Sequence, residues 1–251
     1  MRSATFVAAA AFVVITTGAL GAQTEGPTLS PLQVEAACAQ PPTLAGAPDG
    51  ALRISGAQDS VRRSLFGSRD LLVVNGGTDA GVQLGQQFFV RRAIRFGLAN
   101  MGYGRGAKTL GWIRIVAVND STAIATIDHV CGGIVTDDYL EPFVVPVLPA
   151  NADRDDSTGE PDFTALGRIL IGNENRVASG TGDFVLIDRG TEQGMTPGTR
   201  FAIFRDIGAA GMPLASIGEG IVISAREMIA LTRITRTRDA VLSGDYVATR
   251  K

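Results

Sequence analysis

The fold is decided by residues 70–88, which read DLLVVNGGTDAGVQLGQQF, because a second stretch of the chain repeats them. Residues 183–201 read DFVLIDRGTEQGMTPGTRF and match the first stretch at an offset of 113 (183 minus 70). In both stretches an apolar run precedes three spaced glycines and a phenylalanine. The matched glycines are Gly77, Gly81 and Gly85, then Gly190, Gly194 and Gly198. Spaced glycines matched inside apolar runs indicate an internal repeat.

The match continues further along the chain. Residues 111–127 read GWIRIVAVNDSTAIATI and face GEGIVISAREMIALTRI at 218–234, at an offset of 107 (218 minus 111). The change of offset gives the first copy six extra residues between Phe88 and Gly111. Surface loops lengthen at little cost in free energy, so we expect a longer loop there.

Each copy is built from short runs of β-branched and aromatic residues with turn residues between them, which is typical of strands. The mature chain shows no long amphipathic helical pattern. We therefore predict an all-β protein of two tandem related small β-barrel modules, SH3-like or RIFT-like. The predicted divisions are a signal peptide at 1–22, a flexible segment at 23–50, module one at 51–145, an acidic Pro-containing linker at 146–165 and module two at 166–251.

The first 22 residues read MRSATFVAAAAFVVITTGALGA. One basic residue, Arg2, precedes an apolar run, and small residues lead up to Ala22. This is the order of a secretory signal peptide, with cleavage expected after Ala22. The alternative is a retained anchor, although the apolar run is short for a membrane span. We expect an exported protein of the periplasm or outer envelope, or a secreted one, with no transmembrane span after cleavage.

The chain has two cysteines, Cys38 and Cys131. Export places them in an oxidising compartment, so we predict that they form a disulfide; two free thiols are the alternative. Such a bridge would tie the N-terminal segment to module one and close a long loop.

Composition excludes several classes of function. The net charge is −2, which argues against a nucleic-acid partner. With two cysteines and one histidine, His129, we predict neither a metal site nor a cofactor. His129, Asp128 and Ser121 are the types of a hydrolase triad, but Asp128 and His129 adjoin on a predicted strand and point to opposite faces. We therefore predict no catalytic residues.

The glycine motif has two interpretations. Its spacing is similar to that of a phosphate loop, which needs a helix N-terminus behind it. Here a strand is expected to follow instead, so we interpret the six matched glycines as turn residues that supply a positive φ.

The pattern of apolar strand, N/D-x-G-T-x-x-G-[VM]-x-x-G-x-x-F resembles β-barrel modules of bacterial envelope proteins. It is similar to the C-terminal domain of flagellar assembly protein T, to the barrels of the rod-shape protein MreC, and to secreted proteins of unknown function that carry LysM domains. The matching residues are Asn75, Gly77, Thr78, Gly81, Val82, Gly85, Phe88, Asp188, Gly190, Thr191, Gly194, Met195, Gly198 and Phe201. The resemblance implies an envelope location, with a peptidoglycan or flagellar role as one possibility.

The most distinctive polar stretch is the basic run at 91–108, RRAIRFGLANMGYGRGAK, which contains no acid. We interpret it as a finger that contacts an anionic envelope polymer or an envelope protein, and not as part of the barrel. The alternative is a solvated loop. The candidate binding residues are Arg91, Arg92, Arg95, Phe96, Tyr103, Arg105 and Lys108.

The sequence thus predicts a non-enzymatic exported cell-envelope protein that binds or scaffolds an envelope polymer or a protein partner. The alternative is a hydrolase of glycan or peptidoglycan that uses surface acids. Oligomeric state is not indicated.

Overall fold

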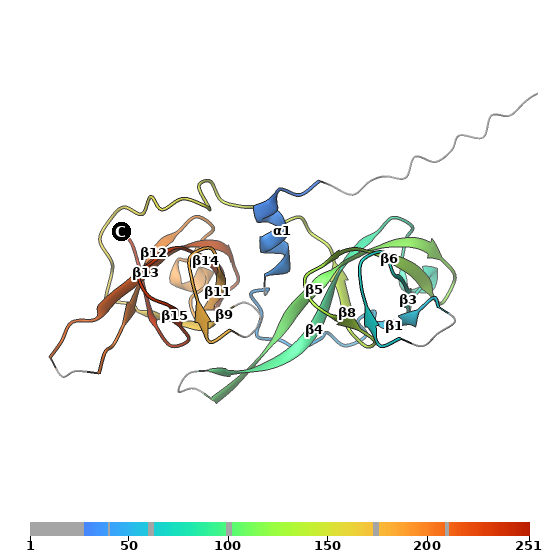
Figure 1. Cartoon of the computed structure of the whole chain (residues 1–251), viewed down its shortest axis with the longest axis horizontal. Helices are drawn as coiled ribbons and strands as arrows, with labels where there is room; N and C mark the ends of the chain where they lie inside the picture. The colour runs from blue at the N-terminus through green and yellow to red at the C-terminus, as the bar shows by residue number, and fades with distance from the viewer. Residues whose placement is uncertain (1–27, 40, 60–62, 99–101, 173–175, 209–210) are drawn as a thin grey trace, which may run out of the picture.

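The computed structural model describes residues 28–39, 41–59, 63–98, 102–172, 176–208 and 211–251, and Figure 1 shows their arrangement. The predicted signal peptide lies outside the described residues. The chain is nearly all β, with one α-helix in the described part. The elements are α1 Pro31–Cys38, β1 Ile54–Ala57, β2 Leu65–Phe66, β3 Leu71–Val74, η1 Thr78–Ala80, β4 Gln87–Leu98, β5 Gly102–Val118, β6 Ala123–Val130, β7 Ile134–Val135, β8 Tyr139–Pro142, β9 Gly167–Gly172, β10 Ala178–Ser179, β11 Phe184–Ile187, η3 Thr191–Gln193, β12 Arg200–Arg205, β13 Ala215–Ala225, β14 Ala230–Thr237, β15 Val241–Leu242 and β16 Tyr246–Thr249.

The strands form two units that lie side by side (Figure 1). The first unit, β1 to β8, is a six-stranded sheet in the order β1-β3-β6-β5-β4-β8. The second unit, β9 to β16, is a closed barrel that reads β9-β11-β14-β13-β12-β16 around its circumference. A small pair of strands accompanies each, β2 with β7 and β10 with β15. All strand pairs of both units are antiparallel, and each unit contains a three-strand meander, β4-β5-β6 or β12-β13-β14. A closed barrel leaves no unpaired edge.

The edges of the first sheet also meet. The Ile54 amide donates to the Asp138 carbonyl at 3.0 Å, and the Leu140 amide donates to the Leu52 carbonyl at 2.8 Å. An isolated bridge joins Arg53 to Tyr139 next to them. The two ends of this sheet therefore satisfy each other's backbone groups.

Each unit has its own apolar core because alternate residues of its strands point inward. In β3, Leu72 and Val74 are fully buried among the core residues of the first unit. In β11, Val185 and Ile187 do the same in the second. The other face of β11, with Phe184 and Leu186, belongs to a third apolar cluster that lies between the units.

Residues 31–38 form a helix within the segment 23–50 that the sequence analysis expected to be flexible. Pro31 begins the helix, and Ser30 and Gln33 complete a reciprocal capping box. The helix has only eight residues and almost no amphipathic pattern, so its apolar positions gave no signal. What holds it is tertiary packing, with Ala37 buried against Phe89 and Trp112 of the first unit.

The predicted disulfide is confirmed. Cys38, the last residue of α1, is bonded to Cys131 across 93 positions of sequence, with the two Cα atoms 5.4 Å apart. The bridge fixes α1 on the first unit at the side that faces the second (Figure 1). In the chain-entropy picture, closing so long a loop is worth about 4–5 kcal/mol.

The six extra residues of the first stretch do not lengthen a loose loop. They extend β4 and β5 into a long ribbon, paired from Gln87 with Arg114 to Leu98 with Gly102 and interrupted by one bulge after Val90. Two side chains of this ribbon, Ile94 and Phe96, pack into the cluster between the units, and Phe96 is almost fully buried. The ribbon and α1 together attach the first unit to the second.

In the part of the chain that the structure describes, no helix is both long and apolar enough to cross a membrane.

A candidate binding groove between the two units

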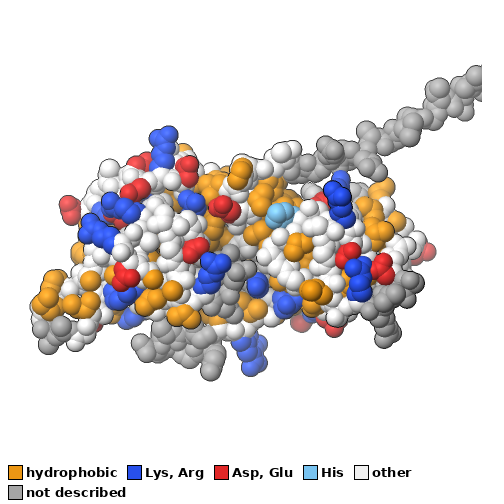
Figure 2. Space-filling view, viewed as in Figure 1, with side chains coloured by type: hydrophobic (Ala, Val, Ile, Leu, Met, Phe, Trp, Pro, Cys, Tyr) orange, Lys and Arg blue, Asp and Glu red, His pale blue; other side chains and the backbone are white. Residues whose placement is uncertain are grey.

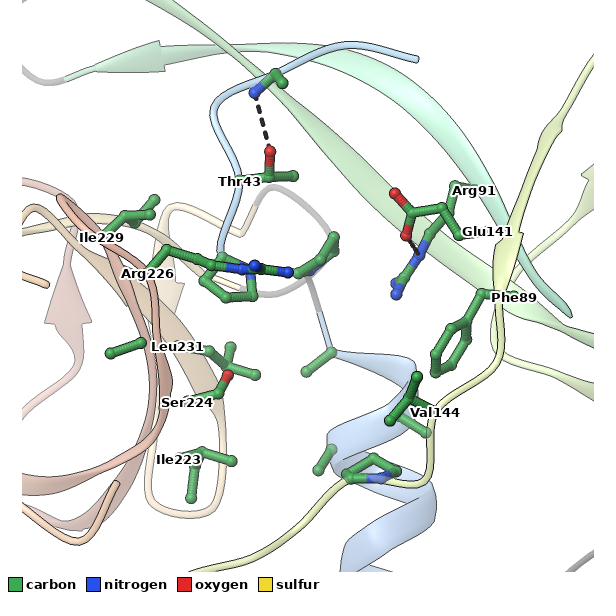
Figure 3. Close-up of a pocket in the computed structure, with 18 of the residues that line it drawn as sticks. Thr43, Phe89, Arg91, Glu141, Val144, Ile223, Ser224, Arg226, Ile229 and Leu231 are labelled. Carbon is green, nitrogen blue, oxygen red and sulfur yellow. Dashed lines mark hydrogen bonds and ion pairs between the residues drawn. The ribbon is translucent and has the colours of Figure 1, made fainter. Parts of the chain in front are cut away.

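A groove of about 990 Å³ opens between the units (Figure 3). One wall comes from β13, β14 and the turn between them, and includes Ile223, Ile229 and Leu231. The opposite wall comes from the first unit, with Phe89 of β4 and Val144 beyond β8. Helix α1 forms the floor and the segment that follows it crosses one end (Figure 3). A second hollow of about 650 Å³ lies beside it and shares Val144, Val147 and Ile223.

Large apolar side chains are exposed along this groove. Val147 is 85% exposed, Val144 68%, Met228 57% and Leu44 47%. Figure 2 shows hydrophobic side chains gathered at the junction of the two units, near the single histidine. Single exposed apolar residues are ordinary, but several around one hollow are typical of an interaction site.

The groove contains one paired cation and one unpaired cation. Arg91 is buried; its Nε donates to Glu141 at 3.1 Å and its guanidinium lies 4.2 Å from the centre of the Phe89 ring. Burial lowers the pKa of Arg91, and Glu141 opposes that shift. Arg226 instead reaches into the groove from the second unit (Figure 3), and no described residue pairs with its guanidinium. The groove therefore offers a free positive charge beside apolar walls.

After the Phe143 amide, which donates to the Gln87 carbonyl at 3.0 Å, the backbone that follows β8 is largely unpaired. Among the described residues, the N–H groups of Val144, Val145, Val147 and Leu148 have no hydrogen-bond acceptor in the protein. The Pro146 carbonyl accepts from Gln33 Nε2 at 3.2 Å. Val145 and Leu148 each precede a proline, which disfavours helical backbone and favours an extended chain. This segment, residues 143–149, lies outside the regular strands and is called the bridging strand below.

The bridging strand and the groove were not predicted. The acidic Pro-containing linker was taken to begin at residue 146, so the apolar run FVVPVLP at 143–149 was divided between module and linker. That apolar run without a charged residue was the signal available in the sequence.

The side chains of the basic run lie in different environments. Arg91 also donates to Thr109, whose hydroxyl donates to the Ala39 carbonyl at 2.7 Å. Arg92 pairs with the buried carboxylate of Asp138 through two bonds of 2.7 and 2.8 Å. Phe96 packs against the second unit, Lys108 is half-buried, and the side chain of Tyr103 lies outside the described part. Much of the run is thus built into the fold, contrary to the expectation of a separate finger.

Arg95 and Arg105 are the exposed part of the run. They are direct cross-strand partners on the β4–β5 ribbon. Both are exposed, and no described residue forms an ion pair with either. Like charges placed directly opposite each other on a sheet are unfavourable, and an anion between them would relieve the repulsion.

The six matched glycines lie in two corresponding turns. Gly81, Gly85, Gly194 and Gly198 have φ values of 76°, 80°, 77° and 94°, in the left-handed region. The positive φ predicted for all six is wrong at Gly77 and Gly190, whose φ values are −129° and −134°. These two precede the 3-10 turns η1 and η3, and glycine is needed there because the chain passes close to the β5–β6 and β13–β14 turns. A Cβ on Gly190 would lie 2.1 Å from the Arg226 carbonyl oxygen, so this glycine sets the position of one groove wall.

The hydrolase-type residues are not arranged as a triad. His129 stacks on Trp112 with ring centres 4.4 Å apart, and burial lowers the pKa of the imidazole. Asp128 accepts from Gln87 and Arg114, at 3.0 Å each. The His129 ring also lies within 4.8 Å of the sulfurs of Cys38 and Cys131, but those atoms are bonded to each other and offer no thiolate to a metal ion.

No family model matches the sequence, and no curated protein is similar enough to count as a relative.

Tyr139, in the strand that carries Glu141, gives a pH-dependent test of this region. Burial raises the pKa of its phenol to about 12. The unfolded chain deprotonates near pH 10, so alkali favours unfolding and the contribution of Tyr139 to stability falls between pH 10 and 12. We expect the denaturant midpoint of Tyr139→Phe to fall less steeply between pH 10 and 12 than that of the wild type. A variant whose midpoint falls as steeply as that of the wild type would contradict the burial of this phenol.

Proposed function

We propose that the chain is a non-enzymatic, exported binding protein of the bacterial cell envelope, whose groove receives an extended segment of a partner protein. The observation that carries the proposal is the bridging strand. It presents unpaired N–H groups between two hollows, with Val144 and Val147 exposed along it. An added strand would satisfy these backbone groups while its side chains enter the hollows.

The proposed partner segment is apolar with an acidic residue. Its apolar side chains would cover Val144, Val147 and Met228, and its carboxylate would pair with Arg226. A carboxylate that joins a guanidinium in this half-closed site makes a charge-assisted, two-pronged contact. A neutral glycan fits less well, because sugar sites rely on several polar groups, whereas this groove has mostly apolar walls.

We further propose that the two units are copies of one module. The strand order is the same in both, and β3 pairs with β6 in the register that β11 adopts with β14. Left-handed backbone also recurs at four equivalent positions, even where one copy lacks glycine. The equivalent pairs are Arg69 with Gly182, Gly81 with Gly194, Gly85 with Gly198 and Asp137 with Gly244.

A second candidate function is contact with an anionic envelope polymer through Arg95 and Arg105. It is favoured by the cross-strand placement of these two arginines without described acidic partners. Such contact would weaken as salt is added, because both side chains are exposed. The groove and the arginine pair make separable predictions.

Binding assays with the purified mature chain test these candidates. We expect Val147→Asp combined with Met228→Asp to lose most capture of detergent-solubilised envelope protein, because both changes place charge on the apolar rim. Val177→Asp is the matched control, since Val177 is 74% exposed and lies outside the groove lining.

The same preparation is tested on purified cell wall. Salt-sensitive co-sedimentation that is lost in Arg95→Gln with Arg105→Gln, together with protein capture unaffected by the groove changes, would favour the polymer function. Release of soluble wall fragments by the pure protein would establish the hydrolase instead.

A further inference from the structure

The contact between the two units joins a hairpin of the first to a face of the second. The second unit has an equivalent hairpin and the first unit an equivalent face, and neither is covered within the described part of the chain. Inside the chain, the β4–β5 ribbon of the first unit places Ile94 and Phe96 against the outer face of the second unit. That face is formed by side chains of β9, β11, β13, β14 and the turn between β13 and β14. Its members are Leu170, Ile171, Phe184, Leu186, Ile221, Ile223, Ile229 and Leu231.

The equivalent face of the first unit is uncovered. By the offsets of the repeat, Leu71 and Val73 correspond to Phe184 and Leu186, and Val116 corresponds to Ile223. Leu71 is 41% exposed, Val116 is 43% exposed and Val73 is half-buried. Ile124, at the position of Leu231, is half-buried as well. This face, Leu71, Val73, Val116 and Ile124, is called the open face below.

The equivalent ribbon of the second unit is also free. β12 and β13 form the hairpin that corresponds to β4–β5, and they are paired out to Arg205 with Ala215. Ile207 stands at the position of Ile94 and is 54% exposed. Met212, on the returning limb, is 60% exposed. An apolar residue at the position used for docking in the first unit thus has no surface to pack on within its own chain.

The two free surfaces lie at opposite ends of the molecule. In Figure 1 both long hairpins project in the same sense, the β4–β5 ribbon beneath the second unit and β12–β13 beyond it. The strands of the open face, β3 and β6, lie at the other end of the picture. The units follow one another in the same orientation, so a contact between molecules that repeats the internal one joins head to tail. Such an interface is heterologous and does not close on two copies.

We propose that the mature protein self-associates head to tail, with the β12–β13 hairpin of one copy docked on the open face of the next. Ile207 and Met212 pack on Leu71, Val73, Val116 and Ile124, as Ile94 and Phe96 pack on the second unit within the chain. The open face is smaller than its internal counterpart, and no second α1 covers it. The association is therefore weaker than the internal contact and depends on protein concentration.

Sedimentation of the mature chain tests the proposal. We expect the weight-average mass to rise continuously with concentration, without a plateau at the dimer. Ile207→Asp with Met212→Asp, and separately Leu71→Asp with Val116→Asp, should each give monomers. Val177→Asp, at a residue that is more exposed (74%) but lies on neither surface, should behave as wild type. The proposal is overturned if the wild type stays monomeric at every concentration. It is also overturned if both double variants still self-associate as the wild type does.

Mixing the two double variants distinguishes this geometry from a symmetric dimer. One variant keeps its open face and the other keeps its hairpin, so the mixture should regain a single contact and stop at dimers. A mixture that stays monomeric overturns head-to-tail docking. Sedimentation with anionic phospholipid vesicles covers the other use of an apolar hairpin tip. Vesicle binding that depends on Ile207 and Met212, in a protein that remains monomeric, would assign the hairpin to lipid and also overturn the proposal.

Discussion

Replacing Gly77 by valine is expected to unfold the first unit, and replacing Gly190 by valine to unfold the second. A Cβ at Gly77 would lie 2.0 Å from the Asn119 carbonyl oxygen, and at Gly190 it would lie 2.1 Å from that of Arg226. These are backbone atoms of tight turns, so no side-chain rotation relieves the overlap. Each change also displaces the backbone bonds from Thr78 to Asn119 or from Thr191 to Arg226. We expect a loss of about 3 kcal/mol or more.

The single tryptophan makes the two outcomes distinguishable, because Trp112 lies in the first unit. In Gly77→Val the tryptophan emission should shift to that of the unfolded chain, whereas Gly190→Val should lose strand signal in circular dichroism with less change in emission. Gly46→Val is the control, since a Cβ there meets nothing within 4 Å. Equal denaturant midpoints for Gly77→Val and the control would contradict the packing described for these turns.

Replacing Asp138 or Asp245 by alanine is the second change with a large expected effect. Both carboxylates are almost fully buried. Asp138 accepts two bonds from Arg92 and one from the Val135 amide at 2.7 Å. Asp245 repeats this arrangement with Arg205 and the Leu242 amide. Removing the carboxylate leaves a backbone donor and a guanidinium without their acceptor, so we expect a loss of about 3 kcal/mol in each case.

Chemical denaturation of the four variants Asp138→Ala, Asp245→Ala, Arg92→Gln and Arg205→Gln checks this account. The arginine changes should cost less than the aspartate changes, because the Val135 and Leu242 amides keep their acceptors. Arg95→Gln serves as the control for loss of positive charge, since Arg95 is exposed. If Asp138→Ala is no less stable than Arg95→Gln, the buried carboxylate does not hold this turn.

The strands were predictable because repetition and alternation are local properties of the sequence. The apolar runs of β3 and β11 and the glycines between them fix similar turns in both units. The disulfide was predictable from the number of cysteines and the expected compartment. The helix was not, because eight residues with little amphipathic pattern are held by capping and by packing on Phe89 and Trp112.

The groove depends on contacts that no local pattern records. From the sequence, Arg91 and Arg92 were predicted to belong to a basic surface. Their acidic partners, Glu141 and Asp138, lie some fifty positions away in sequence, and the pairing of β4 with β8 brings them close. Phe96 was predicted to belong to the same surface, but it is buried because the second unit lies beside the ribbon. The placement of one unit against the other depends on tertiary contacts that the sequence of neither unit records alone.

The central claim, that the groove holds a segment of a partner protein, is tested most directly by photo-crosslinking in the cells that produce the protein. A photoreactive phenylalanine is placed at Val147 in the bridging strand, or at Leu84, which is similarly exposed but outside the groove. We predict a discrete protein adduct from position 147 and none from 84. The adduct should disappear with Met228→Asp and weaken with Arg226→Gln. Adducts of equal yield from both positions, or an adduct at 147 that survives both changes, would contradict the claim.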